Sequence, residues 1–219
     1  MYDVSFDNEN NVELKNKKIM YLLIKRAFDI VMSGIAMLVL SPIFLIIAVL
    51  VKVDSKGPVF FGHKRLGQGG KIIKVYKFRT MVQNAEAMLD TLPEDKLEEF
   101  KENFKLDDDP RITKVGSVLR ESSLDELPQL LNIFLGNMTI VGPRPIIVKE
   151  LEKYHEFGTK LLSVKPGLTG NWQANGRSET TYEERVDMDM EYIDKRGLVF
   201  DLVIIFKTFG AVFRKRGAK

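Results

Sequence analysis

The sequence predicts a mainly helical α+β protein with a membrane element, interfacial amphipathic helices and one cytoplasmic domain that contains a small β-hairpin. Three observations lead to this fold class: a stretch without charge at residues 30–51, two short β-prone runs around a glycine-rich turn, and several segments with helical periodicity. The 219 residues, 45% of them hydrophobic, can bury one domain-sized core, and the chain has no internal repeat.

The N-terminal residues 1–18 are polar and have no periodic apolar face, so we expect a mobile tail there. The net charge of +3 is mild, but basic residues gather near the uncharged stretch and at the C-terminal end: Lys15, Lys17, Lys18, Lys25, Arg26, Arg214, Lys215, Arg216 and Lys219. This distribution favours an anionic membrane surface and argues against nucleic acid as the partner. We expect Arg26 and Asp29 to form an ion pair at the membrane edge.

Composition excludes several kinds of site. The chain has no cysteine, which excludes disulfides, thiolate metal sites and cysteine nucleophiles. His63 and His155 lack metal-ligand spacing, and we expect both to be ordinary surface or boundary residues. Residues 67–70 fail the dinucleotide-binding pattern because Ile72 stands where the third glycine belongs, so this cluster predicts a hairpin turn.

The membrane element is predicted around residues 30–51. As one helix these 22 uncharged residues would be about 33 Å long, enough to cross a hydrocarbon core. Ser41 and Pro42 fall midway, where proline removes a backbone hydrogen bond and serine can satisfy a freed carbonyl group. This break, together with basic residues on both flanks, favours a re-entrant hairpin over residues 19–54. A kinked transmembrane helix is the alternative.

A cytoplasmic domain is predicted at residues 55–197, and it begins with a β-hairpin formed by residues 57–61 and 72–78. Alternation along the second strand puts Lys77 and Arg79 on one face with Ile73 and Val75, and it puts Lys74, Tyr76 and Phe78 on the other. The cations of the first face either line a phosphate site or solvate the strand.

The next part of the domain is strongly acidic. Residues 83–106 predict a solvated helical excursion that is broken near Pro93. The aspartates at residues 107–109 resemble the paired aspartates that hold metal in many nucleotide-sugar glycosyltransferases. The same residues, followed by Pro110, also suit a turn and the start of a helix, and both interpretations remain open.

Residues 120–134 place two adjacent acids, Asp125 and Glu126, at the start of a short apolar helix. Leu124, Leu127, Leu131 and Phe134 recur at helical spacing, so we expect that face to pack while the acids point away from it.

The same two acids also have a structural interpretation. Ser122 or Ser123 can cap the helix, and Ser123 with Glu126 forms a capping-box pattern. Pro128 favours the first turn instead, which would make Asp125 the cap. Capping of either kind does not explain the arginines on both sides of the segment.

The C-terminal part of the chain alternates helices and loops. An amphipathic helix is predicted at residues 146–163 and a second helix at residues 182–195. Trp172 lies after a glycine-rich loop and suits either the core or a surface that stacks on a base. Residues 198–213 are mostly apolar but short for a span, so residues 198–219 predict an interfacial helix with a basic tail.

Several motifs together resemble one family. They are KFRTM at residues 77–81, DPRITKVG at 109–116, Arg120 with SLDELPQL at 123–130, GPRP at 142–145, KPGLTG at 165–170, and Trp172-Gln followed by Asn175-Gly-Arg177. In this order, over about residues 20–215, they resemble the bacterial sugar transferases, the monotopic phosphoglycosyl transferases. This family loads a sugar phosphate onto a polyprenyl phosphate.

The resemblance implies a covalent mechanism at the inner leaflet of a bacterial cytoplasmic membrane. It implies that Asp125 is the nucleophile that takes the sugar phosphate from a UDP-sugar and releases UMP, and that Glu126 is its partner acid. A Mg²⁺ cofactor would be held by Asp125 and Glu126. Arginine pairs well with phosphate, which makes Arg120, Arg144 and Arg177 the natural clamp. With the resemblance, Lys77, Arg79 and Thr80 become substrate-binding candidates.

The resemblance also favours the re-entrant hairpin, with its break at Ser41 and Pro42, and the minimal form of the family. Asn137 departs from the family, in which aspartate commonly follows the glycine, so an essential anion at that position is doubtful. Two other functions stay open: a metal-dependent glycosyltransferase that uses residues 107–109 and releases UDP, and a non-enzymatic membrane scaffold. The sequence leaves the oligomeric state open, and a homo-oligomer is compatible with it.

Overall fold

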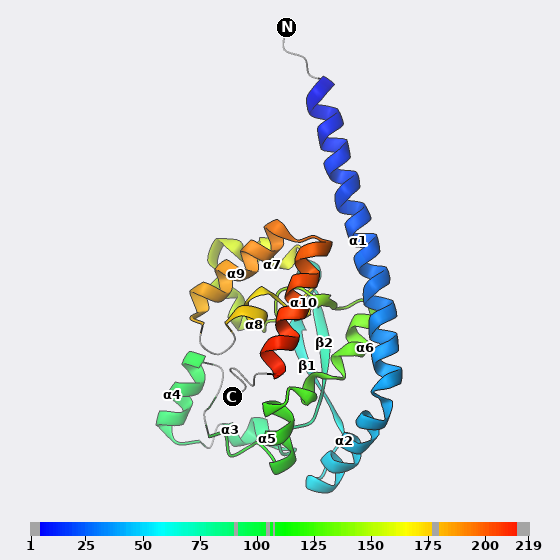
Figure 1. The fold of residues 1–219 in the computed structure, drawn as a ribbon. Helices are drawn as coiled ribbons and strands as arrows, with labels where there is room; N and C mark the ends of the chain where they lie inside the picture. The colour runs from blue at the N-terminus through cyan, green and yellow to red at the C-terminus, as the bar shows by residue number, and fades with distance from the viewer. Residues whose placement is uncertain (1–4, 90–91, 104–105, 107, 177–179, 214–219) are drawn as a thin grey trace.

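The computed structural model describes residues 5–89, 92–103, 106, 108–176 and 180–213. Most of these residues are helical, and a small antiparallel hairpin is present, so the mainly helical fold class is confirmed (Figure 1). Arg177, Asp107 and the basic tail from residue 214 onward lie outside the described residues.

A long helix and its bent continuation form one side of the molecule (Figure 1). Helix α1 spans Ser5–Val39 and α2 spans Ser41–Asp54, with a bend of 62° between Lys18–Val39 and α2. Pro42 lies in the first turn of α2, and the hydroxyl of Ser41 donates a hydrogen bond of 2.8 Å to the carbonyl of Leu38. The predicted break at Ser41 and Pro42 is therefore confirmed.

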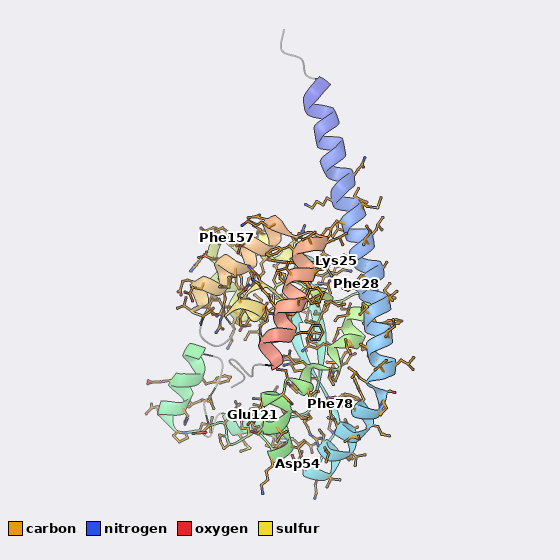
Figure 2. All side chains as sticks on the ribbon, in the orientation of Figure 1. Lys25, Phe28, Asp54, Phe78, Glu121 and Phe157 are labelled. Atoms are coloured by element: carbon orange, nitrogen blue, oxygen red, sulfur yellow. The ribbon has the colours of Figure 1, made fainter. Side chains whose placement is uncertain are left out.

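Within the described part of the chain, no single helix is long and apolar enough to cross a membrane alone. The arms Lys18–Val39 and Ser41–Asp54 reach that length and composition only when they are taken together. Both arms carry exposed apolar side chains, including Val31, Leu38 and Val53, and side chains project from them away from the rest of the molecule (Figure 2). Exposed apolar surface of this extent is typical of contact with a membrane or a partner.

The N-terminal boundary differs from the prediction. Helix α1 begins at Ser5, whereas we expected a tail without regular structure through residue 18. The segment between these positions contains no glycine or proline. Extending a helix that is already formed adds one hydrogen bond per residue without a new nucleation cost, so the helix continues upstream.

The predicted ion pair between Arg26 and Asp29 is wrong. Arg26 donates instead to the carbonyls of Ile133, at 2.6 Å, and Phe134, at 2.8 Å. These carbonyls belong to the last turn of α6 (Gln129–Leu135), where the regular helical hydrogen-bond pattern ends, and that of Ile133 also accepts from the amide of Gly136 at 3.0 Å. Arg26 therefore caps α6 and fixes it to α1.

Asp29 is buried rather than exposed. One of its oxygens accepts a hydrogen bond from the hydroxyl of Thr139 at 2.7 Å, and the other accepts one from the amide of Ile140 at 2.9 Å. Both donors lie on β3 (Thr139–Val141). The carboxylate thus attaches α1 to β3 through two hydrogen bonds.

The predicted β-hairpin is confirmed, with antiparallel strands β1 (Phe60–Leu66) and β2 (Ile72–Phe78). Strand β1 begins later than the predicted residue 57 because Pro58 has no amide hydrogen for the ladder. The connecting 3-10 turn, Gln68–Gly70, holds its two glycines at φ of 70° and 74°, which favours glycine. A second two-stranded sheet is parallel and pairs β3 with β4 (Gly167–Thr169).

Helix α6 is attached to β2 through a buried side-chain amide. The Asn132 amide donates to the carbonyl of Lys74 at 2.7 Å, and its oxygen accepts from the amide of Tyr76 at 2.9 Å. Asn132 is fully buried, so these bonds are shielded from water. They hold the strand that carries Lys77 against the segment that carries Asp125.

The packing face of α6 differs from the prediction. Leu130 and Ile133 are buried, whereas Leu131 and Phe134 are exposed. The chain between residues 124 and 126 is a 3-10 turn, and the α-helix starts only at residue 129. The helical periodicity therefore restarts, and the leucines at 124 and 127 do not share a face with Leu131.

The acidic excursion has the predicted form, with α3 (Ala85–Leu89) and α4 (Glu94–Asn103) on either side of Pro93. Helix α5 (Lys114–Glu121) follows it.

The single helix predicted at residues 146–163 is wrong. This segment is a 3-10 stretch, Val148–Phe157, followed by α7 (Gly158–Leu162). His155, with φ of 45°, interrupts the winding, and it is exposed, as predicted. The interruption lets Tyr154 and Leu161 both reach the core.

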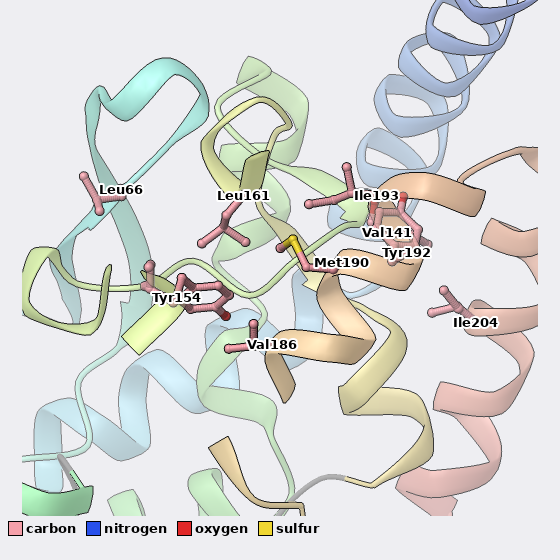
Figure 3. Close-up of a cluster of buried hydrophobic side chains, with 10 residues drawn as sticks. Leu66, Val141, Tyr154, Leu161, Val186, Met190, Tyr192, Ile193 and Ile204 are labelled. Carbon is pink, nitrogen blue, oxygen red and sulfur yellow. Dashed lines mark hydrogen bonds between the residues drawn. The ribbon is translucent and has the colours of Figure 1, made fainter. Parts of the chain in front are cut away.

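The main core lies between the end of the hairpin and the C-terminal helices (Figure 3). Helices α8 (Asn171–Asn175), α9 (Tyr182–Lys195) and α10 (Leu198–Phe213) cover it, and the last two confirm the predicted helices. Its buried side chains include Leu66, Val141, Leu161, Val186, Met190, Tyr192 and Ile204.

Helix α10 lies beside α1 and keeps an exposed apolar surface that includes Val199, Phe206 and Phe209. Asp201 is buried and joins the two helices, because it pairs with Lys25 at 2.6 Å. The exposed apolar face of α10 is what an interfacial helix requires.

Candidate active site

Asp125 and Glu126 lie on a short 3-10 turn, Leu124–Glu126, between α5 and α6. Neither capping interpretation holds. Ser123 makes no capping hydrogen bond with its side chain, and the residue before α6 is Pro128 rather than Asp125. Ser123 has a left-handed φ of 58°, which costs roughly 1 kcal/mol for a non-glycine residue. This kink separates the acids from α5.

Helix α5 supplies Arg120 to the site. Its first turn is capped by Thr113, whose hydroxyl accepts from the amide of Gly116 at 3.0 Å. A Cβ at Gly116 would overlap with the carbonyl oxygen of Thr80, so glycine lets α5 approach the segment that follows β2 closely. The Arg120 Nε then donates to the Thr80 hydroxyl at 2.9 Å. The hydroxyl of Ser122 bonds back into α5 and caps nothing downstream.

Lys77 contacts both acids from the face of β2 that was predicted to carry it. Its Nζ lies 2.7 Å from Glu126 Oε1 and 3.4 Å from Asp125 Oδ2. The Asp125 side chain is 8% exposed and that of Glu126 is 28% exposed. The ammonium group therefore balances two carboxylates, one of which is almost shielded from water.

The surroundings shift the two carboxyl pKa values in opposite directions. Burial raises the pKa of Asp125, and the opposing charges of Lys77 and Arg120 do not fully cancel this effect. Burial also acts on Glu126, but there the charges of Lys77 and Arg144 outweigh it and lower the pKa. Glu126 is therefore the more firmly ionised of the pair.

Arg144 lies on the Glu126 side of the site and stacks on Trp172, with 5.8 Å from its guanidinium carbon to the ring centroid. Arg185 covers the same ring at 4.7 Å. Trp172 is 8% exposed, so it serves as a packed support for two cations rather than as an open stacking surface. Burial and, after it, the nearby charge of Arg144 lower the pKa values of Arg185 and Arg65. Several cations gathered in this way favour the binding of an anion.

Sequence reasoning missed Arg185, Arg65 and His63 at this site. Arg65 pairs with Glu150 at 3.2 Å and lies 3.3 Å from the His63 ring nitrogen. Burial and the nearby cations lower the pKa of His63 to about 4, so it is neutral at pH 7. The strand register gave a usable signal, since Arg65 and Lys77 alternate onto one face of the hairpin. No local pattern singles out Arg185.

Arg79 lies elsewhere, although we predicted it beside Lys77. It is buried, and its Nη2 donates to the carbonyl of Ser55 at 2.6 Å and to that of Val51 at 3.1 Å, at the end of α2. Strand β2 ends at Phe78, so the alternation that put Arg79 on the same face as Lys77 ends there too. The structure thus brings together Lys77, Thr80, Arg120, Asp125, Glu126 and Arg144, and leaves Arg79 out.

The described residues contain no cluster of three or more histidine and acidic side chains suited to a metal. Asp109 is engaged by Arg111 at 2.7 Å through both of its oxygens, which leaves it poorly placed for the metal site considered at residues 107–109. Asp125 and Glu126 fit a different arrangement. Magnesium commonly takes one or two carboxylates and completes its shell with substrate phosphates and water.

Comparison with known proteins agrees with the motifs. Residues 20–215 match the family model for bacterial sugar transferases. The chain is 47% identical over 197 residues to the exopolysaccharide production protein ExoY of Rhizobium meliloti, covering 89% of this chain and 87% of that protein.

Two longer relatives carry more explicit names. The chain is 42% identical over 213 residues to the undecaprenyl-phosphate galactose phosphotransferase of Salmonella typhimurium, covering 96% of this chain and 44% of that protein. It is 43% identical over 209 residues to the UDP-glucose:undecaprenyl-phosphate glucose-1-phosphate transferase of Escherichia coli, covering 90% of this chain and 41% of that protein.

Proposed function

The chain belongs to the bacterial sugar transferase family, and we propose that it transfers a sugar 1-phosphate from a UDP-sugar to undecaprenyl phosphate, with release of UMP. Relatives named for this kind of transfer, to undecaprenyl phosphate, support the proposal. The reaction would be the first membrane step in making an exopolysaccharide, capsule or other glycoconjugate.

One observation carries the mechanism: the nearly buried carboxylate of Asp125 lies 3.4 Å from the ammonium of Lys77, with arginines on both sides. A donor diphosphate is itself anionic, so an attacking carboxylate needs neighbouring cations to approach it. Lys77, Arg120 and Arg144 provide this charge. The planar guanidinium groups can bind phosphate oxygens in a fork.

In the proposed reaction, an oxygen of Asp125 attacks the phosphorus that carries the sugar. The bond from this phosphorus to the bridging oxygen breaks, and UMP leaves with that oxygen and its electron pair. A phosphate oxygen of undecaprenyl phosphate then attacks the same phosphorus. The acyl phosphate bond breaks, which returns the carboxylate of Asp125 to its free form.

Asp125 and Glu126 would hold Mg²⁺ together with the donor diphosphate. When bound, the ion supplies positive charge to the diphosphate and its leaving group. Glu126 suits this role because its lowered pKa keeps it ionised and because its side chain is partly exposed. Lys77 would keep both acids oriented.

The location that we propose is the cytoplasmic face of the bacterial inner membrane, with α1 and α2 as a re-entrant hairpin. The 62° bend and the exposed apolar side chains of both arms support this placement. Arg26 and Asp29 attach the hairpin to the domain, so the carboxylates would be held at the height of the lipid head groups.

The nucleotide released tests the proposed function. The full chain is incubated in detergent with Mg²⁺, undecaprenyl phosphate and a panel of UDP-hexoses, and the nucleotides are separated by chromatography. We expect UMP with one or a few of the sugars, which also identifies the donor. Accumulation of UDP would instead indicate a glycosyltransferase, and no turnover across the panel would contradict the proposal.

A further inference from the structure

We propose that a groove between α1 and the corner joining α9 to α10 binds one phospholipid with an anionic head group. The groove has a volume of about 870 Å³ and is lined from Lys18 to Ile24 on one side and from Ile193 to Val203 on the other. This size is within the range of about 300–1,000 Å³ that ligand pockets occupy. None of the residues assigned to the active site lines it. The proposal rests on the membrane association proposed above.

Both walls of the groove are apolar and exposed. Met20 and Ile24 of α1 are 60% and 43% exposed, and Val199 and Val203 of α10 are 77% and 41% exposed. Side chains of this kind on both sides of an open groove favour an occupant with a hydrocarbon chain over a nucleotide or a sugar.

The charged side chains of the groove leave a positive excess. Asp194 is paired with Lys160 at 2.7 Å, and Lys195 is paired with Glu191 at 2.9 Å.

Among the residues that the structure describes, no hydrogen bond or ion pair engages the cations of Lys18 and Arg196. Both line the groove. Two cations without a partner among the described residues, beside an apolar groove, are complementary to a phosphate group that carries acyl chains.

The cations lie at one end of the groove. Lys18 precedes Met20 and Ile24 along α1, and Arg196 lies just before the start of α10, upstream of Val199 and Val203. The two helices run in the same general direction in Figure 1, with the N-terminal end of α10 beside α1. The polar end and the apolar walls are therefore arranged in the order of a head group and its chains.

The width of the groove is fixed by a buried polar cluster. Asp201 accepts hydrogen bonds from Tyr21 at 3.0 Å and Tyr192 at 2.9 Å, and it pairs with Lys25 at 2.6 Å. These contacts join α1, α9 and α10. A groove whose walls are joined in this way is formed before its ligand arrives, which lowers the cost of binding.

A phospholipid fits better than undecaprenyl phosphate, although both have a phosphate and a hydrocarbon chain. The acceptor must bring its phosphate to Asp125, and the groove shares no residue with that site. The groove is therefore assigned to a structural lipid rather than to a substrate.

Native mass spectrometry of the full chain in a non-ionic detergent tests this assignment. Phosphatidylglycerol is titrated against phosphatidylcholine, which has no net charge, and undecaprenyl phosphate forms a third arm. We expect one phosphatidylglycerol to be retained in preference to phosphatidylcholine. The double variant Lys18→Ala with Arg196→Ala should bind it about 30-fold more weakly, because two surface cations are lost.

The matched control removes two exposed lysines outside the groove, in the double variant Lys56→Ala with Lys114→Ala, and should bind phosphatidylglycerol like the natural chain. Gly197→Trp keeps both cations but fills the groove, since a Cβ at this glycine meets no other atom closer than 4.0 Å. It should also lose the lipid. Val199→Trp provides a second filling variant if Gly197→Trp does not fold.

Four results would overturn the assignment: no preference for phosphatidylglycerol, equal binding by the Lys18 and Arg196 double variant, displacement of the lipid by undecaprenyl phosphate, or a lipid-free dimer that Gly197→Trp dissociates. Sedimentation with phosphatidylcholine vesicles separates this inference from the proposed function. If the natural chain sediments with vesicles but selects no anionic lipid, only the groove assignment fails. If it does not sediment at all, the membrane placement fails as well.

Discussion

The negative charges of Asp125 and Glu126 are treated differently by their surroundings, although the two residues are adjacent. Asp125 is the more buried, and its pKa is raised. Glu126 has Lys77 at 2.7 Å and the charge of Arg144 nearby, and its pKa is lowered. In the proposed reaction Asp125 attacks as the carboxylate. The charge of Lys77 favours this ionised form, because it opposes the effect of burial on the pKa of Asp125.

Replacing Lys77 by methionine should therefore change the pH dependence of the reaction. Without the ammonium, burial acts on Asp125 unopposed by its nearest cation, and its pKa rises further. As the pH is lowered, Asp125 of the variant therefore takes up its proton at a higher pH than Asp125 of the natural chain does. We expect the acid limb of the kcat/KM profile of Lys77→Met to be shifted to higher pH than that of the natural chain. At pH 7 its kcat/KM should be lower by at least about tenfold.

Lys74→Met is the matched control, because Lys74 lies on the same strand but contacts the ring of Tyr76 rather than the acids. Its profile should coincide with that of the natural chain. An unchanged acid limb in Lys77→Met would show that Lys77 does not affect the ionisation of Asp125.

Asp189 should make the stability of the protein depend on pH. It is fully buried and accepts a hydrogen bond of 2.8 Å from Tyr154, and none of the described residues donates to its second oxygen. Burial raises its pKa to about 7. The folded chain thus holds a proton that the unfolded chain releases near pH 4, so stability is lost as pH rises from about 4 to about 7.

Asp189→Asn removes this titration while keeping an acceptor for Tyr154. At pH 8 the variant should be more stable than the natural chain by about 2–4 kcal/mol, and the difference should shrink toward pH 4. Thermal unfolding followed by circular dichroism in detergent measures this. Parallel stability profiles for the two proteins would mean that Asp189 does not take up a proton on folding.

Residue roles could be predicted from the sequence where chemistry follows a local motif. Lys77, Arg120 and Arg144 lie around the acids as the motifs imply. Arg79 does not, because the end of a strand decides its direction, and a strand end is not visible in the residue pattern. Arg185 comes from a distant helix and reaches Trp172 only through the tertiary fold.

Among the secondary-structure elements, α1 owes its position to polar contacts rather than to its apolar side chains alone. Asp29 accepts from both a hydroxyl and an amide of β3, and Arg26 binds the end of α6. Helix α1 is consequently fixed to the domain from one side. The bend at Ser41 then determines where α2 returns.

Asp29→Ala should destabilise the protein by about 2–3 kcal/mol, which corresponds to a fall in Tm of about 5–10 °C for a chain of this size. The buried amide of Ile140 and the hydroxyl of Thr139 would lose their acceptor. Asp29→Asn keeps one acceptor oxygen and should lose less. Thermal unfolding in detergent compares the three proteins, and equal Tm values would show that α1 is held by other contacts.

Elements with strong local signals were predictable: the break at Ser41 and Pro42, the hairpin, and the helices at residues 182–195 and 198–213. The segments that failed depend on single backbone angles. His155 at φ of 45° divides the helix expected at residues 146–163, and Ser123 at φ of 58° resets the periodicity before α6. Neither residue is a glycine, so the residue type does not predict a left-handed conformation at either position.

In the molecule as a whole, α1 connects the separate parts. It contacts α6, which follows the acid pair, and also β3 and the exposed apolar helix α10. In the proposed membrane arrangement, this connection sets the height of the site relative to the lipid. The path of the chain through the bilayer is therefore part of the mechanism.

Labelling at introduced cysteines tests that path, and the cysteine-free chain gives each label a single target. Asn16→Cys lies before the bent pair and Lys56→Cys lies after it. In a re-entrant hairpin both cysteines should react with an impermeant maleimide only in inverted membrane vesicles. A spanning arrangement would expose one cysteine in inverted vesicles and the other in intact cells.

The proposed chemistry requires that Asp125 carry the sugar phosphate between the two half-reactions. The full chain is therefore mixed with Mg²⁺ and the UDP-hexose that it uses, without undecaprenyl phosphate, quenched, digested and mapped by mass spectrometry. We expect a hexose phosphate on the peptide that contains Asp125, absent from Asp125→Asn and discharged when undecaprenyl phosphate is added. Turnover by Asp125→Asn at the natural rate, or an adduct that persists in the presence of the acceptor, would contradict the covalent role of Asp125.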